Sequence, residues 1–102
     1  MDPEDLADEY VRKADALAAA KRTDEALGVY DLAVGVYPDC TEAWTGKANV
    51  LRLQGKRREA LECTERALEI GLSPVAETLR DILVDELRRE GVLSDRNFRG
   101  RG

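Results

Sequence analysis

Apolar and polar residues alternate along the first part of the chain with the period of an α-helix. Leu6, Tyr10, Ala14 and Leu17 fall at positions i, i+4, i+8 and i+11, which places them on one face of a helix. The polar stretch 21–23 interrupts this series, and a second apolar series then runs up to Pro38. The pattern predicts two helices joined by a tight turn. The second apolar series consists of Ala26, Leu27, Tyr30, Ala33 and Val34.

The same pattern returns 34 residues later along the chain. Self-similarity at a fixed period of this size indicates stacked supersecondary units, so residues 41–74 are predicted to form a second pair of helices. Tyr10 and Trp44 keep an aromatic residue at the equivalent position. The identities between the two units are Lys13 with Lys47, Ala14 with Ala48, Leu17 with Leu51, residues 25–27 with 59–61, and Ala33 with Ala67.

A third segment begins at Ser73-Pro74 and matches neither unit beyond its first turn. Leu79, Ile82, Leu83 and Leu87 give it a broad apolar face, which is typical of a helix that caps the end of a stack. We therefore predict one domain over residues 1–90 and a flexible Arg- and Gly-containing tail over 91–102. Within that domain the first repeat covers about 7–40, the second about 41–74 and the capping helix about 74–90.

Local signals set the expected ends of these helices. Asp2, Thr23, Thr41 and Ser73 are residue types that cap helix N-termini, and each precedes an apolar series. Gly71 follows the fourth series and is predicted to end that helix with a positive φ.

The repeat resembles the tetratricopeptide repeat, whose general pattern is W-x2-L-G-x2-Y, then A-x3-F, A and P. Small residues that let paired helices approach closely are the strict part of this pattern, and the departures are Lys for Leu, Ala for Gly and Thr64 for an aromatic residue. The resemblance implies an all-α solenoid of antiparallel helix hairpins, here with five helices. The first unit reads Tyr10-x2-Lys13-Ala14-x2-Leu17, Ala26-x3-Tyr30, Ala33 and Pro38, and the second reads Trp44-x2-Lys47-Ala48-x2-Leu51, Ala60-x3-Thr64 and Ala67.

Composition narrows the classes of function. The net charge of −5 argues against nucleic-acid binding by the whole domain, because a phosphate backbone needs a basic face. No apolar run approaches the roughly 18 residues that cross a bilayer. The acidic N-terminus differs from a basic signal peptide, so we expect a cytoplasmic protein without membrane contact.

The chain offers little reactive chemistry. It has no histidine, and Cys40 and Cys63 lie apart without metal-ligand spacing. No glycine-rich phosphate motif is present, so neither an enzyme, a cofactor nor a metal site is expected. Cys63 aligns with Val29 of the first unit, which predicts a small apolar filler in a helix rather than a reactive thiol.

The family resemblance implies a non-catalytic adaptor, scaffold or co-chaperone-like module that binds a peptide or helix of another protein in a concave groove. Asn49 is expected to clamp a peptide backbone, and Arg52 and Arg80 to take a carboxylate. The two-carboxylate clamp of chaperone-binding members is not predicted, because only Arg80 fits it. Carried over by repeat position, the groove residues are Val11, Arg12, Asp15, Thr45, Asn49, Arg52, Leu53, Arg80 and Leu83, with Asp8, Glu42, Ala76 and Leu79 on the same face.

Two alternatives remain open. The chain is acidic over residues 1–10 and carries five arginines over 88–102, so a homodimer through these charged ends or through the apolar face of residues 79–87 is one of them. Weak RNA contact through Arg96, Arg99 and Arg101 of the tail is the other.

Overall fold

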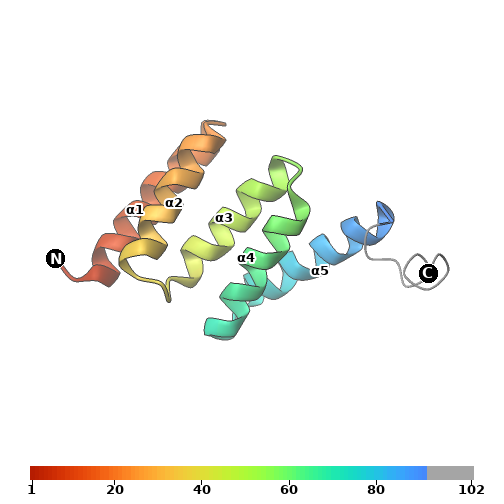
Figure 1. The fold of residues 1–102 in the computed structure, drawn as a ribbon. Helices are drawn as coiled ribbons and strands as arrows, with labels where there is room; N and C mark the ends of the chain where they lie inside the picture. The colour runs from red at the N-terminus through yellow and green to blue at the C-terminus, as the bar shows by residue number, and fades with distance from the viewer. Residues whose placement is uncertain (92–102) are drawn as a thin grey trace.

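A computed structural model describes residues 1–91 of the chain, and over that range it consists of five α-helices without a strand (Figure 1). The predicted all-α class and five helices are thus confirmed. None of these helices is long and apolar enough to span a membrane. Residues 92–102 of the predicted tail, with the proposed RNA contact, lie outside the described residues. The helices are α1 (Pro3–Ala19), α2 (Thr23–Val36), α3 (Thr41–Leu53), α4 (Arg57–Ile70) and α5 (Pro74–Arg89).

The helices form two hairpins and a final single helix. α1 packs on α2 and α3 packs on α4, while α5 lies against α4 and also contacts α3. α1, α3 and α5 therefore form one layer, with α3 in contact with both of its neighbours. Figure 1 shows these three helices running in the same direction, so that their N-termini share one end of the layer.

Fully buried alanines from both helices of each hairpin belong to the same core cluster. Ala14 and Ala26 in the first hairpin, and Ala48 and Ala60 in the second, have no exposed surface. Interior packing is dense, so a larger side chain at a helix crossing would force the two backbones apart. These pairs of small residues are the ones that coincide when the two repeats are overlaid.

The core consists of two clusters that meet at Leu27, which packs against both. Tyr30 belongs to the first cluster and Cys63 to the second. Both cysteines are buried and free, which confirms Cys63 as a small apolar filler. Thr64, at the position equivalent to Tyr30, is fully buried and donates a hydrogen bond of 2.8 Å to the carbonyl oxygen of Ala60.

The two hairpin turns are built alike, although their residues differ. Arg22 N–H donates to the Leu17 carbonyl in the first turn, and Lys56 N–H donates to the Leu51 carbonyl in the second, each at 2.9 Å. Both turns need one residue in the left-handed region. Gly55 takes φ of 83° without steric cost, whereas Lys21 takes φ of 66° at the equivalent position of the first repeat.

Several predicted helix ends differ from the structure. Ser73 caps α5, since its hydroxyl accepts a hydrogen bond from Ala76 N–H, and Asp2 is the N-cap of α1 without a side-chain bond. Thr23 and Thr41 are instead the first helical residues, and neither serves as a cap. The prediction for Gly71 is wrong, because its φ of 178° is extended backbone that any residue adopts.

The apolar face of α5 closes the end of the stack within the chain itself. Leu79, Leu83 and Leu87 are buried, and Leu79 and Leu83 belong to the second core cluster. Ile82 remains 38% exposed. Burying three leucines contributes several kcal/mol, at about 1.5–3 kcal/mol for each side chain.

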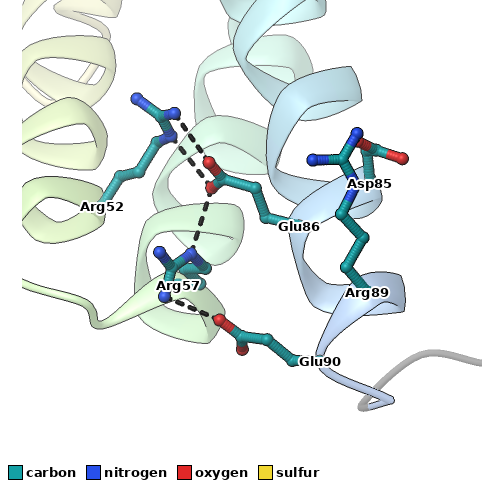
Figure 2. A network of polar contacts seen from close by, with 6 residues as sticks. All are labelled: Arg52, Arg57, Asp85, Glu86, Arg89 and Glu90. Atoms are coloured by element: carbon teal, nitrogen blue, oxygen red, sulfur yellow. Dashed lines mark hydrogen bonds and ion pairs between the residues drawn. The ribbon is translucent and has the colours of Figure 1, made fainter.

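Ionic hydrogen bonds fasten α5 to α3 and α4 (Figure 2). Arg52 of α3 donates from Nε and Nη2 to the two carboxylate oxygens of Glu86, at 3.0 and 2.7 Å. Arg57 of α4 donates to Glu86 Oε1 at 3.1 Å and pairs with Glu90 at 2.7 Å. The two hydrogen bonds from Arg52, and after them the one from Arg57, hold the pKa of Glu86 below its ordinary value.

Replacing Glu86 with glutamine is expected to lower the free energy of unfolding by about 1 kcal/mol at pH 7, because the charged partner of two arginines is lost. The pKa of Glu86 is lower in the folded chain than in the unfolded chain. Its contribution is therefore complete above the ordinary glutamate pKa of 4.5 and disappears as the pH falls through the lower folded value.

Urea unfolding at several pH values measures this difference. The gap between wild type and Glu86→Gln should close below pH 4.5. Asp85→Asn on the same helix is the matched control, since the ion pair of Asp85 within residues 1–91 is with the exposed Arg89. An equal loss of stability in both variants would show that the interactions of Glu86 with Arg52 and Arg57 stabilise the fold no more than the exposed pair of Asp85 and Arg89 does.

Candidate binding groove

A groove of about 850 Å³ lies along the layer formed by α1, α3 and α5. Its size falls within the range of about 300–1,000 Å³ that ligand clefts occupy. α3 forms the middle, α1 contributes one wall and the first half of α5 contributes the other. The lining residues are Val11 and Asp15 from α1, Thr41, Glu42, Thr45, Gly46 and Asn49 from α3, and Ser73, Pro74, Val75, Thr78, Leu79 and Ile82 from the α5 side.

The amphipathic character of α3 creates this surface. Its groove residues recur at the helical spacing 41, 45 and 49, with 42 and 46 beside them. The opposite faces of α3 carry Ala43, Ala48 and Leu51, which are buried against neighbouring helices. A short helix with one polar stripe and one apolar stripe therefore presents a continuous polar strip to the open side.

The two walls of the groove differ in chemistry. The α5 wall is largely apolar, with Val75 and Ile82 exposed at its surface. The central strip offers the amide of Asn49. It also offers the hydroxyl oxygen of Thr45 as an acceptor, since that hydroxyl donates to the Thr41 carbonyl at 3.0 Å. The two charged lining residues, Asp15 and Glu42, are both acidic, and neither forms an ion pair within residues 1–91.

Tyr30 supports the floor of the groove from below. It is 2% exposed, and its hydroxyl donates a short hydrogen bond to Asp15 Oδ1. Its ring lies directly against Gly46, where an added Cβ would come within 2.5 Å of the ring carbon Cε1. Burial, followed by the hydrogen bond to Asp15 and its negative charge, raises the pKa of Tyr30 well above its usual range, so the hydroxyl stays protonated.

Tyr30 and Asp15 of the first repeat meet Gly46 of the second, and the next period does not repeat this arrangement. One period later, the equivalent positions hold Thr64, Asn49 and Arg80. A tyrosine at 64 would have no glycine opposite it, and the smaller threonine instead bonds within its own helix. One period after Tyr30 and Gly46, the chain thus lacks both the aromatic residue and the glycine that makes room for it.

Further carboxylates lie near the N-terminal ends of α1 and α3. The pKa of Tyr37 is raised, first by the charge of Glu4 and then by slight burial. The charges of Asp39, Cys40 and Glu42 raise it further. Burial above all raises the pKa of the Cys40 thiol, and the charges of Glu42 and Asp8 also raise it. Glu42, which lines the groove, accepts a hydrogen bond from the Cys40 thiol at 4.0 Å, and Asp39 precedes Cys40 in the chain. We call Glu4, Asp8, Asp39 and Glu42, whose charges act on Tyr37 and Cys40, the acidic end.

Four of the nine predicted groove residues line the groove, namely Val11, Asp15, Thr45 and Asn49. Glu42 and Leu79, expected on the same face, line it as well. Arg12 is exposed on α1 but outside the lining, and Leu53 is 64% exposed beyond the end of the polar strip.

The other three predicted residues have different environments. Leu83 has no exposed surface and belongs to the core, so its expected contact with a partner does not fit the structure. Arg52 already holds the carboxylate of Glu86 and is not open to one from a partner. Arg80 is exposed outside the lining, with its Nε 3.8 Å from Asp81.

The groove also includes residues that the repeat overlay did not select. Gly46 is one, and its lack of a side chain is the signal that marks it as a place of close approach. The others are Thr41 and the α5 side from Ser73 to Val75, with Thr78 and Ile82. Among residues 1–91, no three histidine, cysteine or acidic side chains gather in a way that would hold a metal ion.

Comparison with known proteins agrees with the architecture. Residues 7–50 match the family model of the tetratricopeptide repeat. The fold is similar to the crystal structure of YrrB, described as a TPR protein with an unusual peptide-binding site, with a TM-score of 0.74 over 82% of this chain and 23% sequence identity. The similar region covers 44% of the YrrB chain. No curated protein sequence matches this one.

Gly46→Ala is expected to lower the free energy of unfolding by about 1–3 kcal/mol, because the new Cβ would collide with the buried ring of Tyr30. Gly28→Ala in α2 is the matched control, since an added Cβ there meets nothing within 4 Å. That change should stabilise the chain by about 0.5–1 kcal/mol through helix propensity. Thermal unfolding followed by circular dichroism compares the two, and similar gains in stability for both would disprove the close packing at Gly46.

Proposed function

We propose that this chain, whose residues 7–50 match the tetratricopeptide-repeat family model, is a non-catalytic interaction module whose groove along α1, α3 and α5 holds a segment of another protein. The observation that carries the proposal is the groove itself, which combines an apolar wall with a polar central strip. Apolar side chains of a bound segment would rest on Val75 and Ile82, and its backbone would bond to Asn49 and Thr45. Asn49 suits this role because an amide both donates and accepts.

Two further observations support an adaptor or scaffold role. The peptide-binding site named for YrrB belongs to a protein with the same fold, although the low identity carries only the fold to this chain. Both thiols are buried and free, which suits a reducing compartment such as the cytoplasm and argues against thiol chemistry.

Self-association through α5 has less support than partner binding. Leu79, Leu83 and Leu87 are buried within the chain, so most of the apolar face that would drive a dimer is occupied. Val75 and Ile82, which remain exposed on α5, belong to the wall of the groove.

A displayed library of random peptides tests the proposal. Peptides that bind the wild-type chain should bind at least tenfold more weakly to Asn49→Trp, because the indole would fill the polar strip of the groove. Asn49 is exposed, so the substitution should not disturb the core. Fluorescence anisotropy with synthetic versions of the recovered peptides gives the affinities.

Leu32→Trp is the matched control, since Leu32 is a neutral residue of α2 that is exposed and lies outside the groove. Its affinities should stay within twofold of wild type. Peptides that bind both tryptophan variants equally well would show that the groove is not the binding site, and failure to recover any binding peptide would count against the proposal as well.

A further inference from the structure

The charged side chains that line the groove are all acidic. Asp15 and Glu42 line it, Glu4, Asp8 and Asp39 belong to the acidic end, and no lysine or arginine belongs to the lining. Five of the basic residues of α3, α4 and α5 lie beside acids outside the groove. Lys47 pairs with Asp31, Arg52 and Arg57 pair with Glu86, Arg66 lies near Glu69, and Arg89 pairs with Asp85.

None of the five acids of the groove and the acidic end forms an ion pair within residues 1–91. Acids near helix starts also complement the helix dipole, and α1 and α3 begin at this end (Figure 1). Each helix start is equivalent to only about half a positive charge, which is smaller than the full charge of one carboxylate. The dipoles therefore leave the end negative overall.

Asp15 is held in a fixed position. The Tyr30 hydroxyl occupies Oδ1, and Tyr30 is itself locked between Asp15 and Gly46 in the core. A positioned carboxylate at the wall of an open groove loses little conformational freedom when a cation binds to it, which favours a charge-assisted hydrogen bond. The second oxygen, Oδ2, has no hydrogen-bond partner among the described residues.

We propose that the partner segment is cationic: its apolar side chains rest on the α5 wall while a lysine or arginine reaches Glu42 and Asp15. This inference rests on the proposed function of the groove and specifies the chemistry of its ligand. The occupant is a segment of a separate protein rather than a second copy of this chain, because the chain has a net charge of −5 and would repel itself at this surface. Repulsion between like charges would also disfavour an acidic segment, or a segment whose C-terminal carboxylate lies beside the groove.

The test is a double-mutant cycle between the groove and peptides recovered from a random library on the wild-type chain. Those peptides should be enriched in lysine or arginine. Changing the basic residue of a recovered peptide to glutamine, and Glu42 to glutamine in the protein, should each weaken binding about threefold to tenfold. The double change should cost no more than either single change, since the two groups contact each other.

Glu65→Gln is the control in the protein, because Glu65 is an exposed acid of α4 outside the groove, and its affinities should equal those of wild type. Binding of the lysine or arginine peptide should also weaken as salt rises, since the attraction is screened. Peptides that Asn49→Trp blocks but that lack basic residues and ignore Glu42→Gln would overturn the cationic partner and leave the groove intact. Peptides that neither change affects would overturn both.

Two other occupants have distinct outcomes. A full-length chain with Arg96, Arg99 and Arg101 changed to glutamine should bind the peptides as wild type does, and tighter binding would show that the chain's own basic end competes for the groove. Light scattering should show a monomer at micromolar concentration. A dimer that Asn49→Trp dissociates would assign the groove to a second copy and overturn the proposal.

Discussion

Close approach of paired helices at buried alanines is the constraint on which the rest of the structure depends. Ala14 and Ala26 in the first hairpin, and Ala48 and Ala60 in the second, have no exposed surface and lie in the core clusters of their hairpins. Each pair of helices then forms a compact hairpin, and the first hairpin packs against the second through α2 and α3. α3 then has neighbours on both sides in its own layer, and its polar stripe becomes the middle of a groove.

The groove floor depends on a second close approach, between Tyr30 of the first repeat and Gly46 of the second, which the next period does not repeat. Gly46 allows the ring of Tyr30 to lie beneath α3, and the hydroxyl of that ring fixes Asp15 at the wall. The second repeat replaces the tyrosine with Thr64 and closes its end with the leucines of α5. The two repeats share an architecture, but only the first one builds a positioned carboxylate into the binding surface.

Sequence periodicity was sufficient to predict the five helices, the repeat and the small residues at the crossings, because these features recur at fixed spacing. It was less informative about α5. The overlay equates Leu83 with the groove residue Asn49, yet Leu83 is fully buried. Three leucines at i, i+4 and i+8 turn that face of α5 into the core, since no further hairpin within the described residues covers the end of α4.

The misassigned arginine has a similar physical cause. Arg52 was expected to bind a partner's carboxylate, but Glu86 stands one period later on the neighbouring helix and satisfies it within the chain. The turn residues differ for local reasons, since Gly71 lies in extended backbone while Lys21 accepts the left-handed conformation that the hairpin needs. Repeat positions identify which helices face the groove, whereas pairing within the chain decides which side chains remain available to a partner.

The most direct test of the central claim, that a partner segment docks between α1, α3 and α5, is a titration of the 15N-labelled chain with a library-selected peptide, followed by NMR amide shifts. The account predicts that the largest shifts map to Thr45, Gly46, Asn49 and Thr78, which line the groove. Shifts concentrated instead on the exposed faces of α2 and α4, around Gly28 and Glu65, would contradict it.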